Sequence, residues 1–329
     1  MPGFLGAYHA GSVNWLDDES ALSATSDVDV NVVLADGHPP GKRGKFVYRD
    51  VLLEVSYLAR ERLRSPELVL GDYHLAGGLR TPSVILDPSG ELTALQAAVA
   101  RGYAERERVR RRCEQARDKV LAYLDSLNAS APLHDQVIAW LFAAGITTHV
   151  LLVAGLKNPT VRRRYAAVRD LLAEYGRLAF HESLLELLGC ARMSRARVEE
   201  HLDAVTEAFD AAKAVIDVDK TPFAFASDIS DVARPIAIDG SRALIERGLH
   251  REAVFWLVAT YSRCRAVLHH NAPEGVKERF DEGYRRLLGD LGVASFADLK
   301  GRGDEVRRFL PRVWEMAEAV MAANPEIED

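Results

Sequence analysis

Cysteine is scarce in this 329-residue sequence, which contains only Cys113, Cys190 and Cys264. The three lie far apart and form neither a CxxC pair nor a zinc-type spacing, so neither a disulfide scaffold nor a thiolate metal site is expected. This cysteine usage is typical of a reducing compartment and predicts a cytoplasmic protein. The N-terminal residues contain neither a basic segment nor a long apolar segment, so no signal peptide is expected.

Basic residues are not in excess either. The chain has 42 Lys and Arg against 48 Asp and Glu, which gives a formal net charge of −6. Proteins that bind the backbone of DNA or RNA usually carry a basic excess, so we expect no nucleic-acid partner. The first 100 residues carry most of the acidic excess.

The sequence has one long uncharged run, from Val137 to Leu156. A run of about 20 apolar residues is long enough to cross a bilayer. Thr147, Thr148 and His149 interrupt its centre, and an isolated histidine at that depth would be costly in lipid. The run therefore favours a helix buried within a bundle, with no membrane partner.

The amino-acid composition of the chain changes near residue 91. Before it, short apolar or alternating runs at 4–9, 28–34, 46–57 and 83–86 are separated by turn signals and predict strands. Ser65 and Pro66 together are typical of a helix start. After residue 91, Ala, Leu, Arg and Glu dominate and predict long helices. The expected helices span residues 91–127, 133–157, 159–175, 178–189, 194–217, 240–247, 250–271, 274–290 and 302–323.

These patterns predict an α+β protein of two domains. Residues 1–91 would form a small mixed-sheet domain, and residues 92–329 would form an all-α helical bundle domain. No fixed-period repeat is evident, which disfavours a solenoid. The sequence does not indicate the oligomeric state.

Two acidic side chains share one face of the expected strand at 28–34. The alternation places Asp27 and Asp29 on one side and Val28, Val30 and Val32 on the other, where we expect the valines to enter a core. Carboxylates two positions apart on a strand lie roughly 6–7 Å from each other at the Cα level. Their repulsion disfavours this arrangement unless a cation lies between them. Mg²⁺ suits such a site because it binds carboxylate oxygen, water and phosphate.

A third carboxylate, Glu54, lies on a later strand, on the face opposite Leu53, Val55 and Tyr57. If the two strands are neighbours, three carboxylates converge, hold divalent metal and leave one group to accept a proton. The alternative is that the two aspartates line the solvated face of an edge strand and that Glu54 is unrelated to them.

Gly11 and Ser12 follow the first apolar run. A Gly-Ser turn after a strand lets backbone N–H groups and a hydroxyl approach phosphate oxygens closely. Gly11-Ser12, then Asp27-Val28-Asp29, then Glu54 in a later strand resembles the signature of the polymerase-β-like nucleotidyltransferase superfamily. The resemblance covers roughly the first 90 residues, and the helical remainder resembles the kanamycin and streptomycin nucleotidyltransferases in architecture.

The resemblance implies an enzyme and assigns roles to these residues. Gly11 and Ser12 would contact the β- and γ-phosphates of a nucleotide, and Asp27 and Asp29 would bind Mg²⁺. Glu54 would be the third ligand or the general base. The reaction would transfer a nucleoside monophosphate, AMP from ATP as the first candidate, to a hydroxyl of a small-molecule acceptor, with aminoglycoside-like compounds among the candidates.

Two departures from the family keep alternatives open. The spacer between Ser12 and Asp27 is longer than usual, and only a short segment precedes Gly11 where the family has a helix. These departures motivate a second hypothesis, a catalytically silent nucleotide-binding or regulatory protein on the same scaffold. An enzyme that modifies protein or tRNA is a third hypothesis, which the net acidity disfavours for tRNA.

Several further residues are candidates for the same site. His74 would face the cleft or lie as a structural histidine at a helix end. Lys157 and the following Arg162, Arg163 and Arg164 would supply charge for the triphosphate or compensate helix ends. Asp228, Asp231 and Asp239 would cap helices or form an acidic wall for a polycationic acceptor.

Overall fold

The computed structural model describes residues 3–17, 19–35, 42–217, 223 and 225–329. It has an α+β fold in which a mixed sheet comes first and helices follow, as the sequence predicts. The strands are β1 (Phe4–Ala10), β2 (Val28–Leu34), β3 (Gly44–Tyr48), β4 (Val51–Ala59) and β5 (Val84–Leu86). Their order across the sheet is β3-β4-β2-β1-β5, with β2 and β4 parallel and the other neighbours antiparallel.

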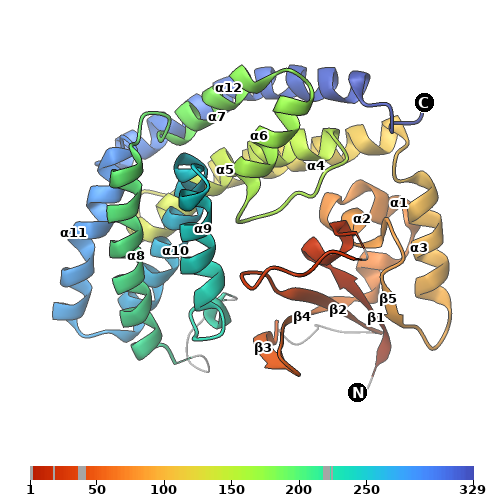
Figure 1. The fold of residues 1–329 in the computed structure, drawn as a ribbon, viewed down its shortest axis with the longest axis horizontal. Helices are drawn as coiled ribbons and strands as arrows, with labels where there is room; N and C mark the ends of the chain where they lie inside the picture. The colour runs from red at the N-terminus through yellow and green to blue at the C-terminus, as the bar shows by residue number, and fades with distance from the viewer. Residues whose placement is uncertain (1–2, 18, 36–41, 218–222, 224) are drawn as a thin grey trace.

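Helices make up the rest of the architecture (Figure 1). Short helices α1 (Pro66–Gly71) and α2 (Tyr73–Leu79) and the longer α3 (Glu91–Gly102) accompany the sheet. The bundle comprises α4 (Arg106–Asp125), α5 (Leu133–Ala154), α6 (Arg164–Glu174), α7 (Leu178–Leu188), α8 (Arg195–Val215), α9 (Gly240–Glu246), α10 (His250–Asn271), α11 (Glu274–Asp290) and α12 (Phe296–Ala323). The boundary expected at residue 91 falls at the first residue of α3, which still packs against α1, α2 and β5.

Some elements begin or end away from their expected positions. The run 46–57 is a hairpin of two strands, because Arg49 and Asp50 turn the chain with φ of 48° and 62°. The single helix expected at 91–127 is two helices, interrupted at residues 103–105. Helix α12 begins earlier than expected, where Ser295 and Asp298 form a capping box. Ser65 caps α1 as predicted, by accepting a hydrogen bond from the backbone N–H of Leu68.

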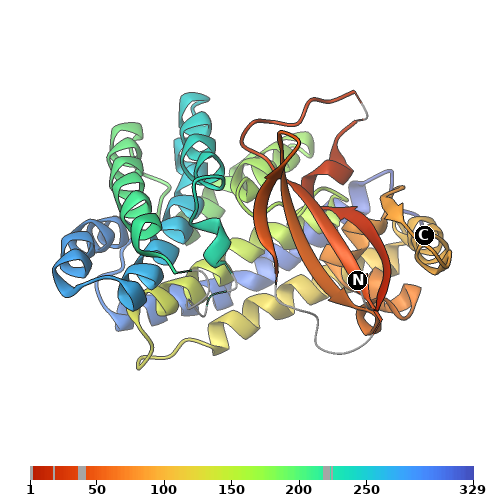
Figure 2. The ribbon, with the colours of Figure 1, turned by 90° about the horizontal axis from the view of Figure 1, so that it is seen from below.

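The apolar core of the sheet lies on the same face as the carboxylates. Tyr8, Val33 and Leu58 pack there against side chains of α1, α2 and α3. Val33 lies four residues after Asp29 in β2. Side chains alternate between the two faces of a strand, so these two point to the same face. The expectation that Val28, Val30 and Val32 enter a core is therefore wrong, since all three are only half-buried on the other face. The helices cover the face that carries the carboxylates, because the end of that face away from the carboxylates is apolar. In Figure 2 the strands lie in front of the helices.

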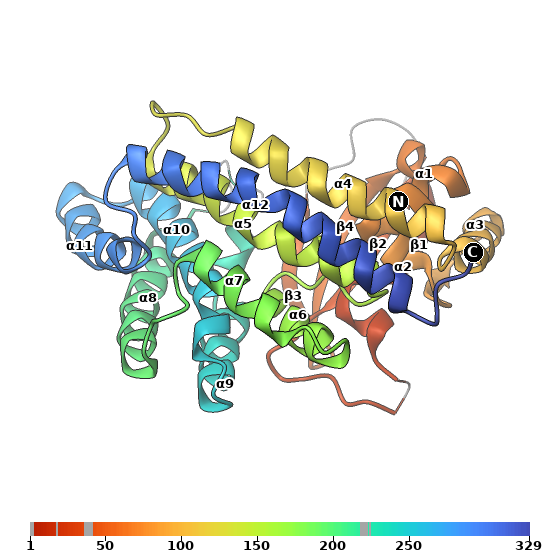
Figure 3. The same cartoon turned by 90° about the horizontal axis from the view of Figure 1, so that it is seen from above.

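Three long helices of the bundle form one group, which contacts the helices of the sheet region through α4. Helices α4, α5 and α12 run side by side (Figure 3) and pack on one another. Helix α5 is the one described helix that is long and apolar enough to cross a membrane, and 89% of its most apolar window is buried inside the fold. The end of the chain returns to the start of α4, where the Arg106 N–H donates to the carbonyl of Glu328 at 2.8 Å.

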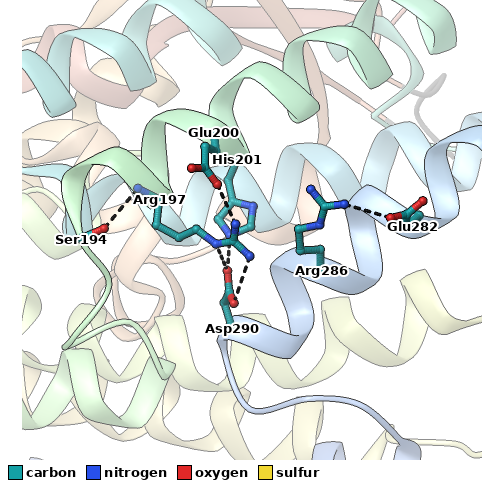
Figure 4. A network of polar contacts seen from close by, with 7 residues as sticks. All are labelled: Ser194, Arg197, Glu200, His201, Glu282, Arg286 and Asp290. Atoms are coloured by element: carbon teal, nitrogen blue, oxygen red, sulfur yellow. Dashed lines mark hydrogen bonds and ion pairs between the residues drawn. The ribbon is translucent and has the colours of Figure 1, made fainter.

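Polar contacts join α8 to α11 at the far end of the bundle (Figure 4). Asp290, the last residue of α11, accepts a hydrogen bond from Nε of Arg197 at 2.6 Å and lies 2.6 Å from Nε2 of His201. Arg197 also donates to Glu200 on its own helix. None of these residues lines the cleft described below, and their contacts link the two helices.

The tight crossing of α5 and α10 gives a stability prediction. A Cβ atom added at Gly145 would lie 2.5 Å from Cε2 of Phe255 and 2.7 Å from a guanidinium nitrogen of Arg164. We expect Gly145→Ala to destabilise the fold by about 1–3 kcal/mol, because buried overpacking forces neighbours out of position. Gly301→Ala is the matched control, since Gly301 is exposed in α12 with open space around it. That change should stabilise by about 0.5–1 kcal/mol. Urea unfolding of both variants measures the difference, and a neutral Gly145→Ala would contradict the close crossing.

Candidate functional site

The strand registers align four residues in one row across the sheet. Ala10 of β1 is paired with Asp29 of β2, Asp29 with Glu54 of β4, and Glu54 with Lys45 of β3. Paired residues on neighbouring strands point to the same face and lie close together. The row therefore places one acidic side chain from β2, one from β4 and a lysine from β3 side by side.

Asp27 completes an acidic cluster with Asp29 and Glu54. It lies immediately before β2, and one carboxylate oxygen from each of the three residues lies within 4.8 Å of the others. The alternative of an edge strand with an unrelated Glu54 is wrong, because β2 lies inside the sheet, between β1 and β4.

Lysines neutralise part of this cluster. Nζ of Lys45 lies 2.9 Å from Oδ2 of Asp27 and also forms an ion pair with Oε1 of Glu54. Nζ of Lys42 lies 2.6 Å from the same Glu54 oxygen. Burial lowers the pKa of the Lys45 ammonium, but the charges of Asp228, Glu54 and Asp27 outweigh it and raise that pKa above its ordinary value. Lys45 is therefore fully charged at neutral pH.

The carboxylates of the cluster differ in their electrostatics. Burial, followed by the charges of Asp27 and Glu54, raises the pKa of Asp29 to about 8. Burial also acts to raise the pKa of Glu54, but Lys45 and Lys42 outweigh it and bring that pKa down to about 2. Asp29 lies among like-charged carboxylates in a partly buried site. The nearby positive charge of Lys45 lowers the pKa of Asp29 too little to offset their effect.

Gly11 and Ser12 lie next to the cluster. Gly11 follows β1 with a φ of +65° and starts a 3₁₀ turn that runs to Trp15. The turn is anchored by Asn14, whose side chain donates to the carbonyls of His9 at 2.7 Å and Gly78 at 2.8 Å. A Cβ at Gly11 would lie 1.8 Å from Oδ2 of Asp29, so only glycine lets this backbone pass so close to the carboxylate.

The cluster and the Gly-Ser turn open into a cleft of about 750 Å³ between the sheet and the bundle. Its bundle wall is formed by the segment 157–163 together with parts of α6, α8 and α10. A cleft of roughly 300–1,000 Å³ is the size that encloses a small-molecule ligand. Seven of the site candidates that line it are Gly11, Ser12, Asp27, Asp29, Glu54, His74 and Lys157.

The basic candidates are placed unequally. Lys157 lines the cleft and pairs with Glu174 at 3.0 Å, while its side chain is 44% exposed. Arg162 and Arg163 also line the cleft, and Arg162 donates to the carbonyl of Thr25 at 3.0 Å. Arg164 instead lies buried in the core, with its guanidinium 4.0 Å from the ring centre of Phe255. Lys157, Arg162 and Arg163 are thus available to an anion, and Arg164 is not.

His74 lines the cleft. Burial, followed by the positive charge of Lys119, lowers the pKa of His74 to about 4, so its imidazole is neutral at neutral pH. Its ring centre lies 4.1 Å from that of Tyr73 and 6.1 Å from that of His149. A neutral histidine there can donate or accept a hydrogen bond but supplies no charge for phosphate.

The three aspartates 228, 231 and 239 do not gather in one place. Asp228 lies in the cleft, where it contacts Lys45 at 3.1 Å and Arg263 of α10 at 3.2 Å. Asp231 is exposed and pairs with Lys213 at 2.6 Å. Asp239 precedes α9 without a side-chain cap bond. The acidic wall and the helix caps are therefore both wrong as descriptions of this trio.

Sequence reasoning missed Lys45, Lys42 and Arg263, and it named Asp228 only as a helix cap or part of an acidic wall. Lys45 had no clear signal, because the two-residue turn at Arg49-Asp50 that pairs residue 45 with 54 contains neither glycine nor asparagine. Nothing in the sequence indicated Arg263 or the contact of Asp228 with Lys45, since both depend on tertiary packing.

The donor set of the cluster fits a hard divalent cation. Three carboxylates offer oxygen ligands, and the adjoining cleft leaves room for water and phosphate, which is the coordination that Mg²⁺ prefers. A search of protein-family models found no match for this chain, and neither did a search of curated proteins.

Proposed function

We propose that this chain is a Mg²⁺-dependent nucleotidyltransferase that transfers a nucleoside monophosphate, AMP from ATP, to a hydroxyl of a small-molecule acceptor. The observation that carries the proposal is the convergence of Asp27, Asp29 and Glu54 within 4.8 Å at a cleft that also contains Gly11 and Ser12. An acidic cluster beside a phosphate-sized turn is the combination that phosphoryl chemistry requires, because metal and triphosphate must meet there.

The row across the sheet suggests how the substrates are arranged. Gly11 and Glu54 flank Asp29 on opposite sides, since β2 lies between β1 and β4. In our proposal the triphosphate lies on the Gly11 side, where Ser12 and backbone N–H groups contact its outer phosphates. The acceptor lies on the Glu54 side, against the bundle wall.

The reaction would then proceed in line. The acceptor oxygen forms a bond to the α-phosphorus, the bond from that phosphorus to the bridging oxygen of the β-phosphate breaks, and pyrophosphate leaves. The hydroxyl proton passes to the carboxylate of Glu54, which is ionised at neutral pH. Bound Mg²⁺ would supply charge neutralisation on the phosphates. Lys157, Arg162 and Arg163 would add counter-charge from the bundle side.

The charges of the bundle wall restrict the acceptor. Each described acidic residue of the bundle that lines the cleft already pairs with a cation: Asp170 with Arg169, Glu174 with Lys157 and Asp228 with Lys45 and Arg263. A polycationic aminoglycoside would have to break these pairs. A neutral or anionic hydroxyl compound fits this wall better.

A second candidate function is a catalytically silent nucleotide-binding protein on the same scaffold. One observation favours it: Lys45 and Lys42 already occupy oxygens of the acidic cluster, so the cluster is partly neutralised by the protein itself. Such a protein would bind nucleotide without releasing pyrophosphate.

Removal of the metal tests the proposed function on the unmodified protein. We expect calorimetry to detect a non-hydrolysable ATP analogue in the presence of Mg²⁺ and to lose at least about 90% of its affinity in EDTA, because the metal bridges carboxylates and phosphates. Equal affinity in both buffers would contradict the proposal. Pyrophosphate release from ATP across a panel of neutral, anionic and cationic hydroxyl compounds then separates the two candidates, since any turnover excludes the silent protein.

A further inference from the structure

Lys45 has an unusual position for a residue beside a metal site. Its Nζ contacts Asp27 at 2.9 Å, Glu54 at a shorter distance and Asp228 at 3.1 Å, and its side chain is only 9% exposed. Two of these partners belong to the acidic cluster, and the third belongs to the bundle. One ammonium group thus links the cluster on the sheet to the bundle.

A divalent ion and this ammonium group compete for the same oxygens. Mg²⁺ binds carboxylate oxygen at about 2.0–2.1 Å, and Oδ2 of Asp27 and Oε1 of Glu54 are the atoms that Nζ contacts. Two cations held by the same oxygens would lie only a few ångströms apart and repel strongly. Lys42 also contacts Glu54, but its side chain is 29% exposed and can turn into solvent.

Asp228 gives Lys45 a second place to bind. It lies in the 3₁₀ segment Ala226–Asp228, which packs against β3, and it is held by Nη1 of Arg263 at 3.2 Å. The close packing of the two segments depends on Gly44, where a Cβ would lie 2.3 Å from the side chain of Ser227. Rotation of the flexible lysine side chain can therefore release Asp27 and Glu54 while the ion pair to Asp228 persists.

We propose that Lys45 binds the acidic cluster in place of a divalent ion, and that a divalent ion displaces Lys45 toward Asp228. This inference rests on the proposed function, because it concerns the same metal site. It makes metal occupancy dependent on the contact between the sheet and the bundle. With metal absent, Lys45 neutralises the cluster; with metal bound, Lys45 neutralises Asp228 and lies beside the acceptor side of the cleft.

Binding of Mn²⁺ without nucleotide tests the exchange, with free Mn²⁺ measured by electron paramagnetic resonance. We expect Lys45→Met to bind Mn²⁺ about tenfold tighter or more than the unmodified protein, because a competing charge is gone. Lys213→Met is the matched control. Lys213 pairs with Asp231 on the surface, so this substitution removes the same charge away from the cluster. Its affinity for Mn²⁺ should not change.

A double-mutant cycle tests the role of Asp228. Asp228→Asn should weaken Mn²⁺ binding in the unmodified protein, where Lys45 loses its second partner, and should have much less effect in the Lys45→Met background. Equal effects in both backgrounds would remove Asp228 from the exchange.

The outcomes distinguish this inference from the proposed function. If the folded unmodified protein and Lys45→Met both fail to bind Mn²⁺, the metal site and the inference fail together. If both bind Mn²⁺ equally well, or the variant binds more weakly, the exchange is wrong and the metal site stands. If Lys45→Met unfolds in metal-free buffer, added Mn²⁺ should restore its melting transition, because the ion replaces the lost charge. Failure of Mn²⁺ to restore it would overturn the inference.

Discussion

Gly11→Ala should abolish metal-dependent nucleotide binding while the protein stays folded. The added methyl group would lie 1.8 Å from Oδ2 of Asp29, so either the turn or the carboxylate must move by more than an ångström. Misplacement on that scale costs on the order of 10²-fold in activity at sites that depend on geometry. We expect at least that loss in affinity for the Mg²⁺ complex of a non-hydrolysable ATP analogue, measured by calorimetry.

Gly90→Ala separates this effect from backbone strain. Gly90 also has a positive φ, of +78°, but no atom lies within 4 Å of the position of its added Cβ. Both variants therefore carry the penalty of a left-handed alanine, roughly 1 kcal/mol. Gly90→Ala should bind nucleotide normally, so equal losses in the two variants would attribute the effect to strain and exclude Gly11 from the site.

The acidic cluster could be predicted from sequence because it depends on local alternation. Asp27 and Asp29 share one side of β2, and Glu54 lies on the same side of β4 relative to its apolar neighbours. A period of two determines which residues share a face, so parallel pairing of the two strands is enough to bring the carboxylates together. The same reasoning cannot decide which face of the sheet the helices cover.

That choice of face depends on residues farther along the strands. The alternating valines of β2 look like the core side, yet they are half-buried, while Tyr8, Val33 and Leu58 hold the helices on the acidic face. One face is acidic at the end that opens into the cleft and apolar at the other end. Within the seven residues of β2, a face that is acidic at one end and apolar at the other is interpreted from sequence as a polar face.

The cations at the site could not be predicted because they depend on a turn and on tertiary packing. The β3–β4 turn contains no glycine or asparagine; Arg49 and Asp50 adopt positive φ there without the usual sequence signal. Arg263 is contributed by α10, more than two hundred residues after the Gly-Ser turn. No pattern within one strand or helix encodes that distance.

Asp27→Asn with Asp29→Asn should separate stability from binding. Burial and neighbouring carboxylates raise the pKa of Asp29 to about 8, so at neutral pH the folded state is disfavoured relative to an unfolded chain in which this carboxyl ionises freely. This penalty is absent below the unfolded pKa and grows as the pH rises toward 8. Asparagine at both positions removes the ionisable group that carries this penalty, so we expect a melting temperature at pH 7 that is equal to or higher than that of the unmodified protein.

The same double variant should lose metal binding almost completely. Opposite unit charges about 4 Å apart interact by roughly 4 kcal/mol at an effective dielectric constant of 20, so two missing carboxylates should weaken Mn²⁺ binding by at least about 100-fold. Asp118→Asn with Asp203→Asn is the matched control, since both residues are exposed on helices and neither lines the cleft. A stable double variant that still binds Mn²⁺ and nucleotide would show that the crowded carboxylates serve another purpose. A stable variant that binds neither Mn²⁺ nor nucleotide would mean that the repulsion lowers stability but is needed for binding the ion.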